Sequence, residues 1–142
     1  MIYTEKTKKA LDFCFEAHKE QRDKSGRPYV FHPFHLAEQM TTEETVVTAL
    51  LHDVAEDTEY TLEDIGKMGF GDAVMEALAL LTHDDETPYM EYVAAIKENE
   101  IAKAVKIADL KHNSDLSRLD TVDEKALKRR EKYLKALELL EK

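Results

Sequence analysis

The order of apolar and polar residues along the chain predicts helices. Apolar residues recur at intervals of three and four positions in most segments, which is the repeat of an amphipathic helix and not that of a strand. Only four glycines and three prolines interrupt the pattern. We therefore predict an all-α fold, a single-domain bundle of roughly seven to nine helices.

The expected helices begin with one over about residues 4–20, followed by a short helix after Pro33. Thr41 and Thr42, followed by two glutamates, predict an N-terminal cap for the most apolar helix, which we expect to include His52 and Asp53. Further helices are expected from Thr61, over 72–80, over 88–96, and from about 101 to beyond 113.

The last segment, residues 123–141, is expected to form a charged amphipathic helix. Its inward stripe is predicted to contain Leu127, Leu134, Leu137 and Leu140. The length of 142 residues suits one domain over 1–142, with the informative motifs at about 4–118 and no linker or repeat.

Composition limits what the chain can bind. Twenty basic and thirty acidic residues give a net charge of −10, which disfavours a general nucleic-acid or membrane-surface binder. No apolar run is long enough to span a membrane, and the start lacks the apolar core of a signal peptide. The lone Cys14 cannot form an internal disulfide, and it falls on an apolar stripe as a structural thiol. We therefore expect a cytoplasmic protein.

The candidate chemistry centres on His52 and Asp53, which interrupt an apolar run where an unpaired imidazole and carboxylate would be costly to bury. His32 lies upstream and Asp109 downstream. If the fold joins these four residues, they form a site with two imidazoles and two carboxylates, suited to manganese, iron, zinc or cobalt. The protein would then be a metal-dependent hydrolase.

Helical spacing suggests how the site could be arranged. On one helix, His52 and Asp53 would lie about 100° apart, and both could reach one ion. His32 would lie just ahead of a turn started by proline. A bound divalent ion can lower the pKa of its water from about 15.7 towards roughly 7. Glu56 and Asp57, one turn after His52 and Asp53, could orient that water or take its proton.

An anionic substrate would need cations near these carboxylates. Lys24 and Arg27 in the preceding loop are candidates, and so is Lys106, three residues before Asp109. Lys111 is expected to face solvent.

Each signal also has a plain structural interpretation. Glu56 and Asp57 could be a solvated helix end, Asn113 a helix cap, and Asp109 the partner of a nearby lysine. Their joint occurrence inside apolar flanks favours a metal site. His83-Asp84 is expected in an exposed loop that could border the pocket, and not as a pair of metal ligands. His18 is expected in the core. His35 and His112 stay unassigned, with hydrogen bonding behind the metal ligands left open.

The ordered set His32, His52-Asp53 and Asp109 resembles the HD-domain metal-dependent phosphohydrolase superfamily. The resemblance is closest to the hydrolase domain of RelA/SpoT-type enzymes and their small single-domain relatives, through residues 17–19, 24–33, 51–58 and 106–113. It implies an HD-type helical fold with Mn²⁺ held by these four residues. It also implies that Glu56 and Asp57 assist the attacking water and that Asn113 lines a nucleotide pocket. The charge argument adds Lys24 and Lys106 as the expected substrate-binding cations. The implied reaction removes the 3′-pyrophosphate from guanosine tetra- or pentaphosphate (ppGpp) alarmones.

Departures from the family pattern concern base recognition. Asp23 stands where an arginine is usual, and Ser114 to Leu116 replace residues that are commonly basic or threonine. One alternative is therefore a phosphohydrolase of another nucleotide or nucleotide cofactor, and another is a non-catalytic nucleotide-sensing or interaction module. The expected partner is a small anionic nucleotide and not a nucleic-acid polymer or membrane. With no synthetase segment, we expect a hydrolase-only chain of undetermined oligomeric state.

Overall fold

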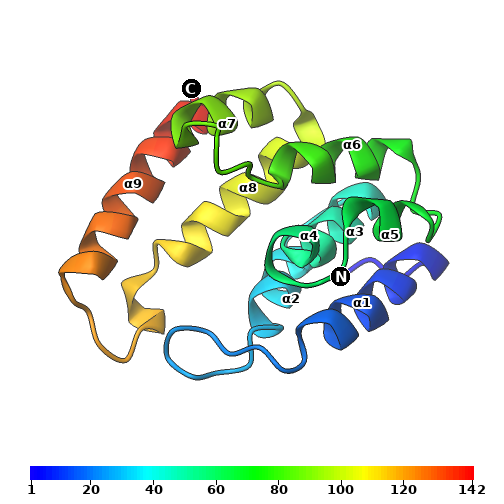
Figure 1. The fold of residues 1–142 in the computed structure, drawn as a ribbon, viewed down its shortest axis with the longest axis horizontal. Coiled ribbons are helices and arrows are strands. Elements are labelled where there is room, and N and C mark those ends of the chain that lie inside the picture. Colours follow the sequence, from blue (N-terminus) through cyan, green and yellow to red (C-terminus); the bar gives the residue numbers. More distant parts are fainter.

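The computed structural model describes residues 1–142 and contains helices and no sheet (Figure 1). The elements are α1 (Glu5–His18), α2 (Phe31–Glu38), α3 (Glu43–Leu51), α4 (Val54–Asp57), α5 (Leu62–Gly66), α6 (Asp72–Leu81), α7 (Tyr89–Lys97), α8 (Glu100–Asn113), the 3₁₀ turn η1 (Leu116–Arg118) and α9 (Glu124–Glu141). The only strand-like pairing is an isolated bridge between Arg22 and Pro28. The all-α prediction is confirmed.

Threonine side chains begin three of the helices. Thr4, Thr42 and Thr61 each accept a hydrogen bond from the backbone N–H three residues later, and each forms a reciprocal capping box. These bonds satisfy amide groups that the first helical turn leaves without partners. The predicted cap ahead of α3 is confirmed, with Thr42 as the capping residue.

Helix α3 lies at the centre of the fold, in contact with α1, α2, α6 and α8 (Figure 1). All residues from Val46 to Leu51 are buried, because neighbours cover the helix on every side. Helix α9 contacts α7 and α8 and runs along the outer edge of the molecule. The core therefore surrounds α3, and α9 is a peripheral addition.

The buried face of α1 contains two residues whose place was predicted. Cys14 is buried, and burial raises the pKa of its thiol to about 12, so it stays protonated and structural. His18 is fully buried, and its Nδ1 lies 2.8 Å from Gln21 Oε1. Its Nε2 has no hydrogen-bond partner. His18 is thus a core histidine, satisfied at one nitrogen.

The chain turns sharply at the expected active-site dipeptide. Helix α3 ends at Leu51, His52 is its C-cap, and Asp53 has φ −106° and ψ 1° as the N-cap of α4. The expectation that both residues lie on one regular helix is therefore wrong. Contacts specific to each side chain hold the turn, because His52 Nδ1 bonds to Ala49 O and Asp53 accepts from Tyr29.

Helix α2 begins earlier than the sequence suggested. It starts at Phe31, so His32 lies on its first turn and not ahead of it. Pro33 is the third residue of the helix, where its missing N–H costs no intrahelical bond. The prediction of a helix starting after Pro33 is wrong by this first turn.

The inward face of α9 also differs from the predicted leucine stripe. Leu140 is buried and Leu137 partly buried, but Leu127 and Leu134 are 51% and 40% exposed. The buried positions near them are Ala126 and Ala136, whose small side chains allow a close approach to the bundle. The predicted stripe is therefore right at Leu137 and Leu140 and wrong at Leu127 and Leu134.

None of the helices combines the length and the apolar character needed to cross a membrane.

Candidate active site

Three residues far apart in the sequence meet in the interior between α2, α3 and α8. The ligand atoms of His32, His52 and Asp109 lie within 4.8 Å of one another, and all three residues are buried. His32 Nε2 is 2.8 Å from Asp109 Oδ1, and His52 Nε2 is 3.5 Å from the same oxygen. The structure thus brings together three of the four predicted metal ligands.

Asp53, the fourth predicted ligand, borders this group from the turn after α3. Its Oδ2 lies 3.0 Å from His52 Nε2 and accepts a hydrogen bond from the Tyr29 hydroxyl. Burial by itself would raise the pKa of Asp53, but the neighbouring His52 outweighs it and lowers that pKa. Asp53 is therefore an ionised carboxylate at the edge of the cluster.

Both carboxylate oxygens of Asp109 accept hydrogen bonds from residues of the same helix. Lys106 Nζ lies 3.0 Å from Oδ2, and Asn113 Nδ2 donates to Oδ1 over 2.9 Å. Burial alone would raise the pKa of Asp109, but Lys106 and the two histidines overcome it, and the pKa falls well below its usual range. Lys106 and Asn113, predicted as substrate contacts, here orient a carboxylate, although both also line the cleft.

The donor set fits a divalent cation. His52 Nδ1 is 2.7 Å from Ala49 O and so carries the ring proton in the neutral form, which leaves the Nε2 lone pair facing the carboxylates. That buried Nε2 has no hydrogen bond of acceptable geometry. An unpaired polar atom in the interior is costly. A cation beside the two imidazoles and two carboxylates would satisfy it.

Glu56 and Asp57 lie at the cleft that leads to this cluster, which has a volume of about 440 Å³. Glu56 Oε1 accepts from the backbone N–H of His83 over 2.6 Å. Burial, Asp53 and Glu56 together raise the pKa of Asp57 to about 6. Asp57 can therefore exchange a proton near neutral pH.

The expectation that His83 and Asp84 lie in a loop is confirmed. The segment lies between α6 and α7, Asp84 is exposed, and the half-buried His83 lines the cleft.

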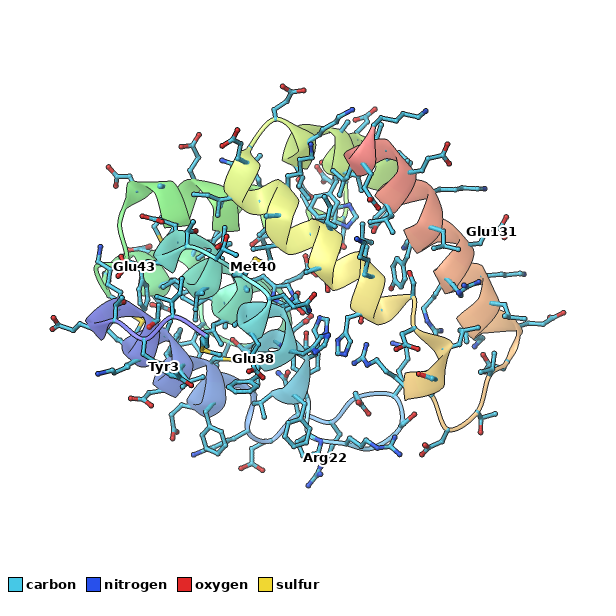
Figure 2. The ribbon with its side chains drawn as sticks, turned by 180° about the vertical axis from the view of Figure 1, so that it is seen from behind. Tyr3, Arg22, Glu38, Met40, Glu43 and Glu131 are labelled. Carbon is cyan, nitrogen blue, oxygen red and sulfur yellow. The ribbon has the colours of Figure 1, made fainter.

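The cleft lies between the α1–α2 loop, which Arg22 marks in Figure 2, and the inner face of α9. Lys24 lines it, whereas Arg27 does not, because Arg27 forms an exposed ion pair with Asp120 at 2.9 Å. Lys111 is exposed, as expected.

Sequence reasoning missed the cations and the tyrosine that α9 contributes to the cleft. Arg129, Lys132 and Tyr133 line it from α9, and Arg118 lines it from η1. Arg118 is engaged with His112 O and Asn113 Oδ1, whereas Arg129 has no ion-pair or hydrogen-bond partner. Nothing in the periodicity of α9 separates these basic residues from their neighbours. Only the close spacing of Arg129 and Tyr133 along one face could have suggested a shared role.

Comparison with known proteins identifies the family. A family model described as an HD domain matches residues 10–112. The chain belongs to the HD domain family, and the residues of the cluster and its acidic pair all lie within the matched range.

Several relatives are described as nucleotide pyrophosphohydrolases, and others, such as a protein of Streptomyces coelicolor that is 35% identical over 137 residues, as GTP pyrophosphokinases. The chain is 38% identical over 91 residues to the guanosine-3′,5′-bis(diphosphate) 3′-pyrophosphohydrolase of Aquifex aeolicus, covering 61% of this chain and 13% of that protein. It is 35% identical over 123 residues to the enzyme of the same description, MESH1, from Homo sapiens, covering 77% of this chain and 68% of the relative. The chain thus corresponds to a small part of the bacterial relative and to about two thirds of the human one.

A solved structure extends the likeness to the whole chain. It is described as a metazoan ortholog of SpoT that hydrolyses ppGpp, and it matches with a TM-score of 0.73 at 28% identity. The match covers 99% of this chain and 85% of the other. The fold is therefore the HD-type helical fold that the resemblance implied.

Proposed function

We propose that this protein is a metal-dependent phosphohydrolase that uses Mn²⁺ to remove the 3′-pyrophosphate from guanosine tetra- or pentaphosphate. The observation that carries the proposal is the buried His32, His52 and Asp109 group at the end of a cleft that also holds two acidic residues. The names of the relatives supply the substrate.

His32, His52, Asp53 and Asp109 would hold the metal. When bound, a divalent ion polarises a phosphoryl oxygen and makes an adjacent water more acidic. Lys106 and Asn113 keep the Asp109 carboxylate in one orientation, since each bonds to a different oxygen. The Tyr29 hydroxyl does the same for Asp53, so the protein supplies both carboxylates in fixed positions.

Glu56 and Asp57 would handle the proton of the attacking water. A carboxylate whose pKa lies near 6 is a better base than an ordinary aspartate and is still ionised at neutral pH. Glu56 is fixed by the His83 amide and can orient the water while Asp57 takes its proton. The two acidic residues thus have different roles because their surroundings differ.

The phosphates would bind the cations of the outer cleft. Lys24 has no ion-pair partner and projects from the loop at one side, and Arg129 and Lys132 project from α9 at the other. They offset the local negative charge of the acidic pair, so a polyanion can enter although the chain carries a net charge of −10.

The test is pyrophosphate release from guanosine tetraphosphate by the purified protein with Mn²⁺. We expect GDP and pyrophosphate as products, with turnover abolished by Asp53→Ala and retained by Lys111→Ala, which alters an exposed lysine outside the cleft. Intact substrate over a range of enzyme concentrations would reject the substrate assignment. Equal turnover by the Asp53→Ala protein would reject the metal centre.

A second candidate substrate class is favoured by Asp23. Its Oδ1 accepts hydrogen bonds from the backbone N–H groups of Ser25 and Arg27, so it shapes the loop and offers no cationic face to a base. The enzyme would then hydrolyse another nucleotide or a nucleotide-cofactor phosphate. A panel of phosphorylated nucleotides, assayed for phosphate and pyrophosphate, distinguishes the two, and activity confined to guanosine alarmones would dismiss the second.

A further inference from the structure

The two histidines of the cluster are anchored in different ways. His52 uses its Nδ1 to bond to a backbone carbonyl, Ala49 O, three residues earlier. His32 uses its Nδ1 to contact another side chain, because His112 Nδ1 lies only 2.7 Å away. The anchor of His32 comes from α8, 80 positions along the chain.

The geometry of the His32–His112 contact is that of a hydrogen bond between ring nitrogens. The two ring planes are parallel to within 1°, and their centroids are 5.0 Å apart. An N···N separation of 2.7 Å is too short for rings lying one above the other, so the imidazoles meet edge to edge. Ring lone pairs point outward in the ring plane, and one Nδ1 can therefore donate directly to the other.

Metal binding decides the direction of this bond. A histidine nitrogen that binds a cation must be unprotonated, and the Nε2 of His32 is the nitrogen that faces Asp109 and His52. A neutral His32 then carries its proton on Nδ1 and needs an acceptor. The Nδ1 of His112 is the only acceptor within hydrogen-bond distance of that nitrogen.

His112 is itself held in place. His35 stacks on its ring with centroids 4.1 Å apart and planes inclined by 27°. Arg118 donates to its backbone carbonyl over 2.9 Å. The stacking from α2 restricts the ring of His112, and the bond from η1 holds its backbone.

We propose that His112 is a positioning residue, which accepts the Nδ1–H of His32 and thereby sets the affinity of the centre for its divalent cation. The inference rests on the metal-binding part of the proposed function and is independent of the substrate. It also distinguishes the two histidine ligands, because a side-chain substitution can remove the anchor of His32 and cannot remove that of His52.

The first experiment titrates the metal-free full-length protein with Mn²⁺ by calorimetry, without substrate. His112→Leu removes the acceptor, and we expect about 10- to 100-fold weaker binding. His112→Asn keeps an acceptor oxygen at the place of Nδ1, and we expect its affinity to stay within about threefold of wild type. Lys111→Ala changes the neighbouring, exposed residue of α8 and serves as the control, with affinity close to wild type.

The second experiment needs no substitution and so avoids any folding defect. Side-chain ¹⁵N–¹H correlation spectra of the Zn²⁺-loaded wild-type protein report which nitrogen of each histidine bears hydrogen. We expect His32 protonated at Nδ1 and His112 unprotonated at Nδ1. A His32 without hydrogen at Nδ1, or a His112→Leu protein with wild-type affinity, would overturn the inference while leaving the hydrolase proposal intact. A wild-type protein that binds no divalent cation would overturn both.

Discussion

The buried cluster at the end of the cleft and the exposed rim at its mouth hold their charged side chains in different ways. In the cluster, the side chains of His32 and Asp109 are 3% and 7% exposed, and each polar atom of these two side chains faces a specific partner. The rim is the α1–α2 loop around Lys24, and in this loop, outside the cleft lining, Arg27 forms an ion pair with Asp120 in which both side chains are more than half exposed. The interior therefore fixes geometry, and the rim supplies charge with little constraint.

This difference separates the chemistry from its specificity. A buried charge that loses its partner cannot be rescued by water, whereas an exposed cation is solvated in either case. Replacing a residue at the rim, such as Asp23 in the loop before Lys24, can change which ligand binds without disturbing the cluster. In the proposed hydrolase, the metal centre and the choice of nucleotide could thus vary independently.

The largest expected contrast comes from removing one acidic residue from each region. Asp109→Ala leaves Lys106 buried without its partner, and we expect a loss of about 3–5 kcal/mol in the free energy of unfolding together with the loss of hydrolysis. Asp120→Ala breaks an exposed pair, and we expect a loss below about 1 kcal/mol. Urea denaturation in the presence of a chelator measures both, and equal losses would contradict the distinction.

Metal addition should act on the cluster alone. At a free Mn²⁺ concentration of 100 times the Kd, binding to the folded state stabilises it by about 2.7 kcal/mol, and a chelator should reverse the effect. We expect the rise in Tm to persist in Lys24→Ala and to vanish in His52→Ala. Thermal unfolding with and without Mn²⁺ tests this, and a full metal shift in His52→Ala would remove His52 from the metal site.

Substitution at the rim should affect substrate binding more than the chemical step. Lys24→Ala removes one unpaired cation from the cleft, and we expect KM to rise about tenfold, or about 1.4 kcal/mol, with kcat within about twofold of wild type. Lys111→Ala, at an exposed position outside the cleft, should change neither. A fall in kcat at constant KM would instead place Lys24 with the reacting groups.

Asp57 lies between the two regions, and its raised pKa has a consequence for stability. With a pKa of about 6 in the folded state and an ordinary value of 3.8, the folded protein binds more protons between these pH values. The metal-free protein should therefore gain stability as the pH falls from about 7 to 4, as far as this group is concerned. Asp57→Asn removes the repulsion from Asp53 and Glu56 at neutral pH.

We expect the metal-free Asp57→Asn protein to be more stable at pH 7.5 by about 1 kcal/mol, a value reduced for the half-exposed position of the group. The same protein should hydrolyse its substrate more slowly. Chemical denaturation at pH 7.5 and pH 4.5 provides the check: the gain should shrink at the lower pH, and a constant gain would mean that ionisation of Asp57 is not the cause.

Local patterns in the sequence were sufficient for the existence of most helices and for selecting the four candidate metal ligands, but not for every helix boundary or for the cleft residues of α9. A threonine cap such as Thr42 depends on only four consecutive residues, and the apolar stretch from Val46 to Leu51 predicts a helix that is buried on all sides. His52 and Asp53 were conspicuous because ionisable groups rarely interrupt such a stretch without a function. These signals depend on short-range spacing, which a sequence contains directly.

The arrangement of the site depended on contacts between distant segments. The 2.8 Å contact between His32 and Asp109 joins residues 77 positions apart, and the contact of His112 with His32 joins residues 80 apart. The break after Leu51 and the placing of Arg129 in the cleft likewise follow from how α2, α8 and α9 meet. Helical periodicity tells which residues share a face of one helix, and only packing decides which faces meet, because that choice minimises exposed surface over the whole chain.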